Sequence, residues 1–245
     1  MYRTLRRLRR PPAPVAAPPA AGPQPELPAG VLVKRTPGLD RPSGFNAGRA
    51  YRAIPGWFSD CEAELLYLLT LMAAGRVLEI GHFLGRSTAA MCDALRDSGR
   101  PVEFNSYDLG YADEAAVREH YRRLYAEPGF ELPAAYRELV FAAGRTTTDL
   151  AREHLTAAGL AGYVNLIAGD FAALDRTRYD LIFCDAAHDP REIAHNLPGL
   201  AAVSADVCTW AVHDSTDANI AAVLAHPGVT PITRVDSLGV YQFRR

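Results

Sequence analysis

Short apolar segments alternate with helical stretches along the chain from about residue 57 onward. The segments are rich in Val, Ile, Leu and Phe, which is typical of buried strands. They predict strands at residues 77–80, 102–107, 164–168, 179–184, 207–212, 230–235 and 240–243. Helices separate most of these strands, but only residues 236–239 separate the last two. The order therefore predicts an α/β fold with a doubly wound seven-stranded sheet, mostly parallel, that ends in an antiparallel C-terminal hairpin.

Two predicted helices flank the first strand. One starts at Ser59, because Glu62 three residues later gives the spacing of a capping box, and Gly75 is its expected end. The other runs from Ser87 to about Arg96 and follows a loop that contains two glycines. The local order is therefore helix, strand, glycine loop, helix.

The connection between the second and third strands is about fifty residues long, which is more than one crossover helix needs. Helical patterns recur in it at residues 113–126, 133–143 and 146–159. Long connections near a site often form lids, so we expect a helical lid insertion at about 111–160. Packing of extra aromatic helices against the domain is the alternative.

The chain divides into three parts by composition. Residues 1–28 are rich in Arg, Pro and Ala and contain too little apolar surface to offset the entropy of ordering, so we expect a disordered tail. Residues 29–75 form an N-terminal arm and a cap helix, and residues 76–245 form the main domain. An Arg-rich organelle transit peptide is the alternative for the tail.

Composition and charge narrow the class of protein. The chain has 245 residues, 49% of them hydrophobic, and a formal net charge of -2, which argues against a general nucleic-acid binder. No run of eighteen apolar residues is present, so we expect no membrane span. The four cysteines form no C-x-x-C pair and are typical of a reducing compartment, so we expect a cytoplasmic protein.

The glycine loop after the first strand is a candidate ligand site. A strand, a glycine loop and a helix N-terminus place backbone N–H groups and the positive end of a helix dipole together, which suits a small anion such as a carboxylate or phosphate. A dinucleotide fingerprint needs a second glycine where this chain has Phe83. The spacing therefore argues against a dinucleotide.

Acidic residues end four successive predicted strands, at Asp108, Asp170, Asp185 and Asp214. In an open α/β sheet the ligand lies outside the carboxyl ends of the strands, where these side chains and the glycine loop come together. Asp108 is placed to accept hydrogen bonds from both ribose hydroxyls of a nucleotide. Asp170 would accept from an adenine amino group while Phe171 packs on the ring. Solvated loop aspartates are the alternative.

The span from about Trp57 to Arg245 resembles the small-molecule O-methyltransferase branch of the class I S-adenosylmethionine-dependent methyltransferases. The resemblance rests on E-I-G-x-x-x-G-x-S at Glu79–Ser87, D-x-x-H at Asp185–His188 and V-H-D at Val212–Asp214. It implies a Rossmann-like fold, S-adenosylmethionine as cofactor and a small-molecule acceptor. The cofactor-binding residues that we expect from the loop, the strand ends and this resemblance are Glu79, Gly81, Gly85, Ser87, Asp108, Asp170, Phe171 and Asp185.

Two departures from the family pattern bear on a metal site. Ala186 and Ala187 replace the usual Gly and second Asp, and Ala205-Asp206 replaces a Gly-Gly pair. The resemblance still implies a candidate Mg²⁺ site formed by Asp185, His213 and Asp214, because carboxylates supply the hard oxygen ligands of that ion. The competing interpretation is that Asp185 binds the cofactor's amine and Asp214 caps the next helix.

Methyl transfer to oxygen usually needs a base to take the acceptor's proton. His188 and His213 are the candidate catalytic residues, because imidazole titrates nearest neutral pH and both lie at strand ends. A structural role is the alternative for each of them.

We therefore expect methyl transfer from S-adenosylmethionine to a hydroxyl of a small molecule, such as a sugar or phenol of secondary metabolism. A nicotinamide-dependent oxidoreductase and a catalytically inactive S-adenosylmethionine-binding partner subunit are the alternatives. A homodimer is compatible with the sequence.

Overall fold

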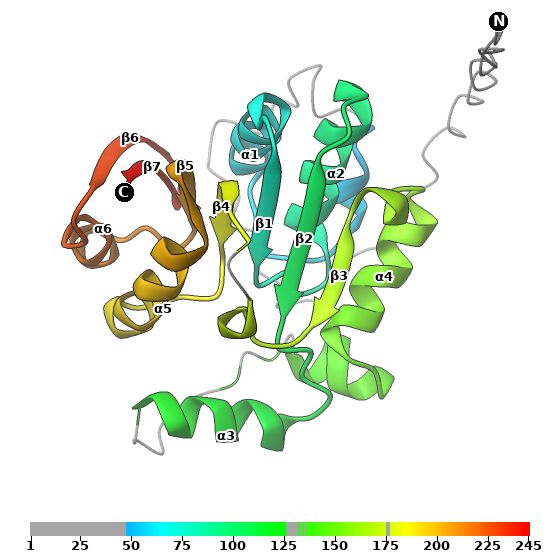
Figure 1. The fold of residues 1–245 in the computed structure, drawn as a ribbon. Coiled ribbons are helices and arrows are strands. Elements are labelled where there is room, and N and C mark those ends of the chain that lie inside the picture. The colour runs from blue at the N-terminus through cyan, green and yellow to red at the C-terminus, as the bar shows by residue number, and fades with distance from the viewer. Residues whose placement is uncertain (1–47, 126–131, 133, 135, 175–176) are drawn as a thin grey trace, which may run out of the picture.

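The computed structural model describes residues 48–125, 132, 134, 136–174 and 177–245 (Figure 1). The predicted tail at 1–28 and the first part of the predicted arm lie outside the described residues. Among the helices of the described part, none is long and apolar enough to cross a bilayer.

A seven-stranded sheet forms the centre of the molecule, with strand order β3-β2-β1-β4-β5-β7-β6. Strands β1 to β5 run parallel, and β7 is antiparallel to both β5 and β6. This arrangement confirms the predicted fold. The strands are β1 Arg76–Ile80, β2 Glu103–Asp108, β3 Asn165–Ala168, β4 Tyr179–Cys184, β5 Ser204–Val212, β6 Val229–Val235 and β7 Leu238–Arg244.

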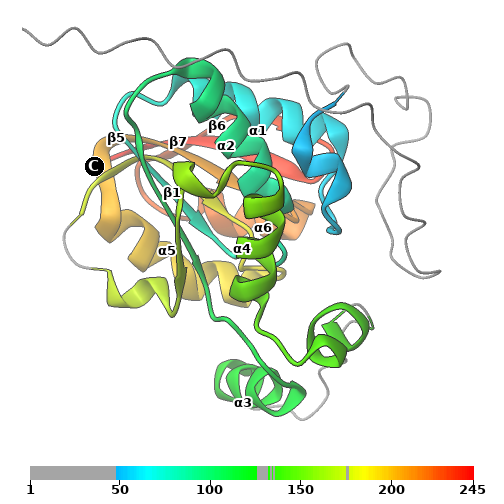
Figure 2. The ribbon, with the colours of Figure 1, turned by 90° about the vertical axis from the view of Figure 1, so that its right-hand side faces the viewer.

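Helices cover both faces of the sheet (Figures 1 and 2). The α-helices are α1 Asp60–Met72, α2 Arg86–Ser98, α3 Glu114–Tyr125, α4 Thr147–Ala157, α5 Pro190–Val203 and α6 Asp217–Leu224. The short helices are η1 Ala50–Ala53, η2 Tyr136–Val140, η3 Phe141–Ala143, η4 Ala161–Tyr163 and η5 Phe171–Ala173. Successive strand residues alternate between the two faces: Val77 packs in the cluster under α1 and α2, and Leu78 packs in the cluster under α5 and α6.

The strand order reverses between β1 and β4, which are hydrogen-bonded neighbours. β1 continues to β2 on one side, and β4 continues to β5 on the other. Such a reversal opens a crevice at the carboxyl ends of the two central strands, because their crossover connections leave in opposite directions. The glycine loop after Ile80 and the acid at Asp185 both lie at this point.

Local sequence signals explain most helix boundaries. Ser59 and Glu62 form the predicted capping box, with both reciprocal hydrogen bonds present. α1 ends at Met72, three residues before the predicted Gly75. Helix α5 was not among the predicted elements. Asp189 caps its start, and it continues through Pro198, a residue that normally ends a helix.

The long connection after β2 splits into two parts. Helix α4 packs beside the sheet and buries Leu155 in the core, as a crossover helix does. Helix α3 lies apart from both helix layers, beyond the carboxyl ends of β1 and β2 (Figures 1 and 2). The predicted lid therefore remains a prediction for the part that precedes α4.

The segment before α1 is attached to the first residue of α2. The buried guanidinium of Arg86 donates hydrogen bonds to the backbone carbonyls of Tyr51, Ile54 and Phe58, at 3.0, 2.9 and 2.9 Å. It also lies over the ring of Tyr51, 5.2 Å from the centroid. No other side chain offers such a planar fork of donors. Arg86 therefore fixes this segment beside the glycine loop.

We expect Arg86→Met to lower the free energy of unfolding by about 3 kcal/mol, because three buried carbonyls lose a charged donor. Urea denaturation would measure the change. Arg52→Met is a matched control in the same segment: Arg52 forms a partly exposed ion pair with Asp60 at 3.3 Å, worth at most about 1 kcal/mol. Equal losses in the two variants would contradict this role for Arg86.

Candidate active site

The glycine loop packs against the end of β4. Gly81 has φ +89°, and a Cβ atom there would lie 2.6 Å from the backbone oxygen of Asp185. Only glycine fits this approach. Gly85, also at φ +89°, donates its N–H to the carbonyl of His82 at 2.7 Å and leads into α2. Phe83 adopts the left-handed region at φ +44°, which turns the chain sharply between the two glycines.

Glu79 is fully buried beneath this loop. Its carboxylate accepts hydrogen bonds from the hydroxyls of Ser87, Thr88 and Ser106, at 2.6, 2.7 and 2.6 Å. Burial raises the pKa of Glu79 to about 7, although the three hydroxyl donors favour the ionised form. Glu79 and Ser87 thus join β1, α2 and β2 below the loop. Their predicted part in cofactor binding stays a prediction, and in this arrangement it acts through the loop.

His82 continues the buried network. Its Nδ1 lies 2.9 Å from the Ser106 hydroxyl and its Nε2 lies 3.1 Å from the Thr148 hydroxyl. Since Ser106 donates to Glu79, it must accept from Nδ1–H, and Nε2 then accepts from Thr148. Burial lowers the pKa of His82, which agrees with this neutral form. No pattern in the sequence predicts this role, because position 82 is one of the unspecified positions between the two glycines of the loop motif.

Asp108 ends β2 beside the loop, as predicted. Its Oδ1 accepts from the Gly110 N–H at 2.8 Å and from the Thr147 hydroxyl at 2.6 Å. Its Oδ2 accepts from the Phe83 N–H at 2.9 Å. Asp108 therefore connects the loop to the start of α4. Its predicted contact with ribose stays a prediction.

Aromatic rings cover the outer side of the loop. The Trp57 and Phe83 ring centroids lie 5.2 Å apart, and those of Phe83 and Tyr136 lie 4.9 Å apart. Trp57 precedes α1, and Tyr136 begins η2 within the connection after β2. Two segments far apart in the sequence thus meet over the tip of the loop.

Asp170 and Phe171 follow β3, and the Phe171 side chain does not lie where the prediction places it. Asp170 accepts from the Ala172 N–H at 2.8 Å and caps the short helix η5. Phe171 is buried in the core cluster under α5, where a Cβ on Gly199 would lie 2.9 Å from its ring. Stacking of Phe171 on an adenine ring would need the ring to leave this core. The exposed Asp170 side chain remains a candidate for the amino group.

His213 lies buried between two carboxylates. Its Nδ1 is 2.9 Å from Asp185 Oδ1, and its Nε2 is 3.1 Å from the Ser237 hydroxyl and 3.4 Å from Glu62 Oε2. Burial opposes its charge, but the two carboxylates raise the pKa of His213 well above 6.5. The predicted roles as base and as metal ligand both need an available ring nitrogen, and neither nitrogen is available. His213 instead orients Asp185.

His188 and Asp214 form an exposed pair at the same edge. His188 Nδ1 lies 2.7 Å from Asp214 Oδ2, and the His188 side chain is 52% exposed. Desolvation by the surrounding protein opposes the charge of the ring, but the hydrogen bond to Asp214 and the negative charges of Asp185 and Asp214 outweigh it and raise the pKa of His188 to about 9. Within the described chain, His188 Nε2 has no hydrogen-bond partner. Asp214 does not cap α6, because Thr216 does so through Asn219.

Three side chains offer a candidate metal site. Ligand atoms of Asp185, His188 and Asp214 lie within 4.8 Å of one another. Two carboxylates suit Mg²⁺, which often takes one or two from the protein and keeps several waters. The two carboxylates therefore fit the predicted ion, and the histidine beside them is His188, not the predicted His213; its Nδ1 lies 2.7 Å from Asp214 Oδ2.

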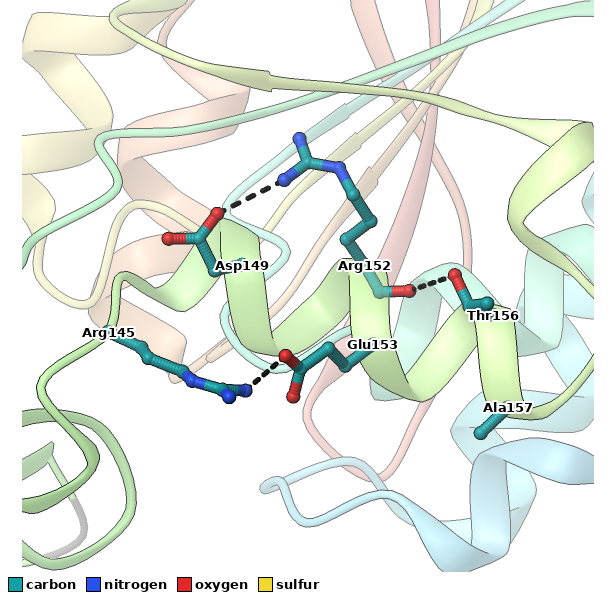
Figure 3. A pocket seen from close by; sticks show the side chains of 6 residues that line it. All are labelled: Arg145, Asp149, Arg152, Glu153, Thr156 and Ala157. Atoms are coloured by element: carbon teal, nitrogen blue, oxygen red, sulfur yellow. Dashed lines mark hydrogen bonds and ion pairs between the residues drawn. The ribbon is translucent and has the colours of Figure 1, made fainter.

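Two of the hollows on the described surface lie against α4 and α3. One, of about 620 Å³, lies on the outer face of α4, where Arg145 pairs with Glu153 and Arg152 pairs with Asp149 (Figure 3). It contains none of the predicted site residues. The other, of about 450 Å³, lies between residues 109–112 and α3 and starts directly after Asp108. This second hollow adjoins the candidate site.

The comparisons with known proteins agree with this geometry. A family model described as a methyltransferase domain matches residues 78–215, which include the glycine loop and the ends of β4 and β5. The chain belongs to this methyltransferase family. The recognition made from the sequence motifs is thereby confirmed at the level of the methyltransferase domain.

Solved structures similar to this methyltransferase are distant in sequence. Cofactor-bound Rv0187 from MTB is 20% identical, with 80% of this chain and 86% of that chain covered and a TM-score of 0.50. The O-methyltransferase TomG from Streptomyces achromogenes is 21% identical, with 74% and 77% covered and a TM-score of 0.45. At such identities the likeness concerns the fold. The search of the curated proteins found no match.

Glu62 and His213 form a buried ion pair in this methyltransferase. Burial opposes ionisation of Glu62, but His213, Ser237 and the Ser59 N–H outweigh it and lower its pKa to about 2. Ionised Glu62 therefore stabilises the fold above about pH 4.5, and this is lost as the pH falls toward 2. Glu62→Gln should cost about 3 kcal/mol at pH 7, with a difference from wild type that shrinks below pH 5.

Thermal and urea unfolding at a series of pH values would measure this difference. Glu64→Gln, on the same helix, is the matched control and should change stability by less than about 0.5 kcal/mol. A Glu62→Gln loss that is independent of pH would contradict an ionised Glu62.

Proposed function

We propose that this protein transfers a methyl group from S-adenosylmethionine to a hydroxyl of a small molecule. The observation that carries the proposal is the juxtaposition of the glycine loop, Asp108 and the His188–Asp214 pair at one edge of a methyltransferase domain. A cofactor site and a base thus face the same crevice, at the reversal point of the sheet.

The cofactor would lie across the carboxyl ends of β3, β2, β1 and β4. Its methionine end meets the glycine loop and the N-terminus of α2, its ribose meets Asp108, and its adenine lies toward Asp170. The hollow between residues 109–112 and α3 adjoins this path. The aromatic rings of Trp57 and Tyr136 lie over the loop and would shield the cofactor from water.

His188 is the proposed base. S-adenosylmethionine, when bound there, would supply the methyl group to the acceptor oxygen and keep the carbon–sulfur electron pair, while His188 Nε2 would take the hydroxyl proton. Asp214 holds Nδ1 and stabilises the imidazolium that forms. Because the pKa of His188 is raised to about 9, the base form is a minority near neutral pH. A sulfonium cation bound nearby would disfavour the charged ring and so increase the neutral fraction of His188.

Asp185 and Asp214 are the proposed Mg²⁺ ligands, and His213 fixes Asp185 from behind. The ion would supply a Lewis acid that lowers the pKa of the acceptor hydroxyl. An acceptor with two adjacent hydroxyls, as in sugars and catechols, suits such a site because it offers two oxygens to one ion.

The two alternative functions, an oxidoreductase and an inactive partner subunit, require different features of the site. A nicotinamide-dependent oxidoreductase needs close approach of a pyrophosphate to the loop, and the Phe83 side chain stands there. An inactive partner subunit needs no base, whereas His188 has an available ring nitrogen. Incubation with labelled S-adenosylmethionine and a panel of sugars and phenols, read by mass spectrometry, tests the proposal. No binding of S-adenosylhomocysteine by calorimetry would refute it.

We expect His188→Ala to lower kcat about 100-fold, because the proton acceptor is lost. Affinity for S-adenosylhomocysteine should change by less than about threefold, since His188 is not proposed to touch the cofactor. His226→Ala, which removes a histidine near the start of β6, is the control. Collapse of cofactor affinity with normal residual turnover would show that His188 is not the base.

Removal of divalent metal by a chelator should lower turnover about tenfold or more, and added Mg²⁺ should restore it. Asp185→Asn should reproduce the loss and abolish the response to Mg²⁺. Turnover that is indifferent to chelation would remove the metal from the proposal and leave the base in place.

A further inference from the structure

The Asp108 carboxylate, which is proposed to bind ribose, already accepts three hydrogen bonds from the protein itself. A carboxylate has about four acceptor positions, two on each oxygen. In the described chain, Oδ1 already accepts from the Gly110 N–H and the Thr147 hydroxyl, and Oδ2 accepts from the Phe83 N–H. One position on Oδ2 is left for a further donor.

The Thr147 hydroxyl is the only side-chain donor of the three. It makes the shortest of these bonds, at 2.6 Å, and Thr147 is fully buried at the first position of α4. The two backbone N–H groups are fixed by the loop and the turn after β2. Thr147 is therefore the donor whose removal would open a position on Asp108 without a change of backbone.

Thr147 is held in place from both sides. The next residue, Thr148, is buried and hydrogen-bonded to His82 Nε2 at 3.1 Å. The preceding residue, Thr146, forms a capping box with Asp149. The first turn of α4 is thus attached to the glycine loop, and the Thr147 hydroxyl has little freedom to leave Asp108.

We infer that Thr147 limits Asp108 to a single hydrogen bond with the ribose of the cofactor, so that only one of the two ribose hydroxyls is recognised by this carboxylate. The inference rests on the proposed function, which places ribose at Asp108. Thr147 is accordingly a specificity-determining residue. Its hydroxyl occupies a position on Asp108 Oδ1 that a ribose hydroxyl could otherwise use, and the same hydrogen bond connects α4 to the proposed cofactor site.

The wild-type protein provides the first test. Calorimetry would compare S-adenosylhomocysteine with its 2′-deoxy and 3′-deoxy forms. Loss of the hydroxyl that donates to Asp108 should weaken binding about tenfold, as expected for a hydrogen bond to a charged group. Loss of the other hydroxyl should weaken binding by less than about twofold, because it has no acceptor on Asp108.

Thr147→Val provides the second test, because valine keeps the shape of threonine and removes the hydroxyl. The variant should bind S-adenosylhomocysteine about tenfold more tightly, and both deoxy forms should now lose affinity. Thr147→Ser keeps the hydroxyl and should retain the asymmetry of the wild type. Thr148→Val removes a hydroxyl from the neighbouring position and should also retain it.

The outcomes separate this inference from the proposed function. Equal losses for the two deoxy forms in the wild type would overturn the inference while the cofactor site stands. Unchanged or weaker binding by a folded Thr147→Val protein would also overturn it. No binding of S-adenosylhomocysteine by the wild type would refute the proposed function, and the inference with it.

Discussion

The arrangement of the site depends on one buried carboxylate. Glu79 lies at the centre of the sheet with no exposed surface, and three hydroxyls from α2 and β2 satisfy its oxygens. A buried charge without such partners would be strongly unfavourable, so the hydroxyls and the carboxylate require one another. This mutual requirement fixes the distance between β1, β2 and α2. The hydrogen bonds of Glu79 and the close approach of Gly81 to the Asp185 backbone together determine the shape of the loop between β1 and α2.

The fold was predictable because its signals are local and redundant. The two central strands, β1 and β4, are mostly apolar segments, and the order of strands and helices admits few topologies in an open sheet. The capping box at Ser59 and Glu62 also gave the start of α1 correctly. The sequence pattern does not predict helix α5, because Pro198 and Gly199 interrupt it; burial of one face of the helix stabilises it in spite of these two residues.

The site was predictable only in part. Strand ends and glycines lie at positions that topology brings together, so the sequence predicts the placement of Asp108, Asp185 and Asp214 at or just after the ends of β2, β4 and β5. The side chains that set their properties come from elsewhere: Glu62 from α1 and Thr147 from α4. No spacing in the sequence relates them to the strand ends, because they meet only through tertiary packing. For the same reason, no pattern in the sequence indicates that Glu62 and Asp185 lie beside the two ring nitrogens of His213.

The placement of β7 between β5 and β6 has a consequence for how copies of this chain meet. It makes β6 the outer strand on one side of the described sheet, with Ile232 57% exposed. An outer strand with an apolar side chain invites another strand to add to it. Pro231 lacks an N–H, and the register of the β6–β7 pairing shifts beside it, so β6 is an irregular strand. An irregular outer strand of this kind disfavours the pairing of β6 with a strand of another molecule.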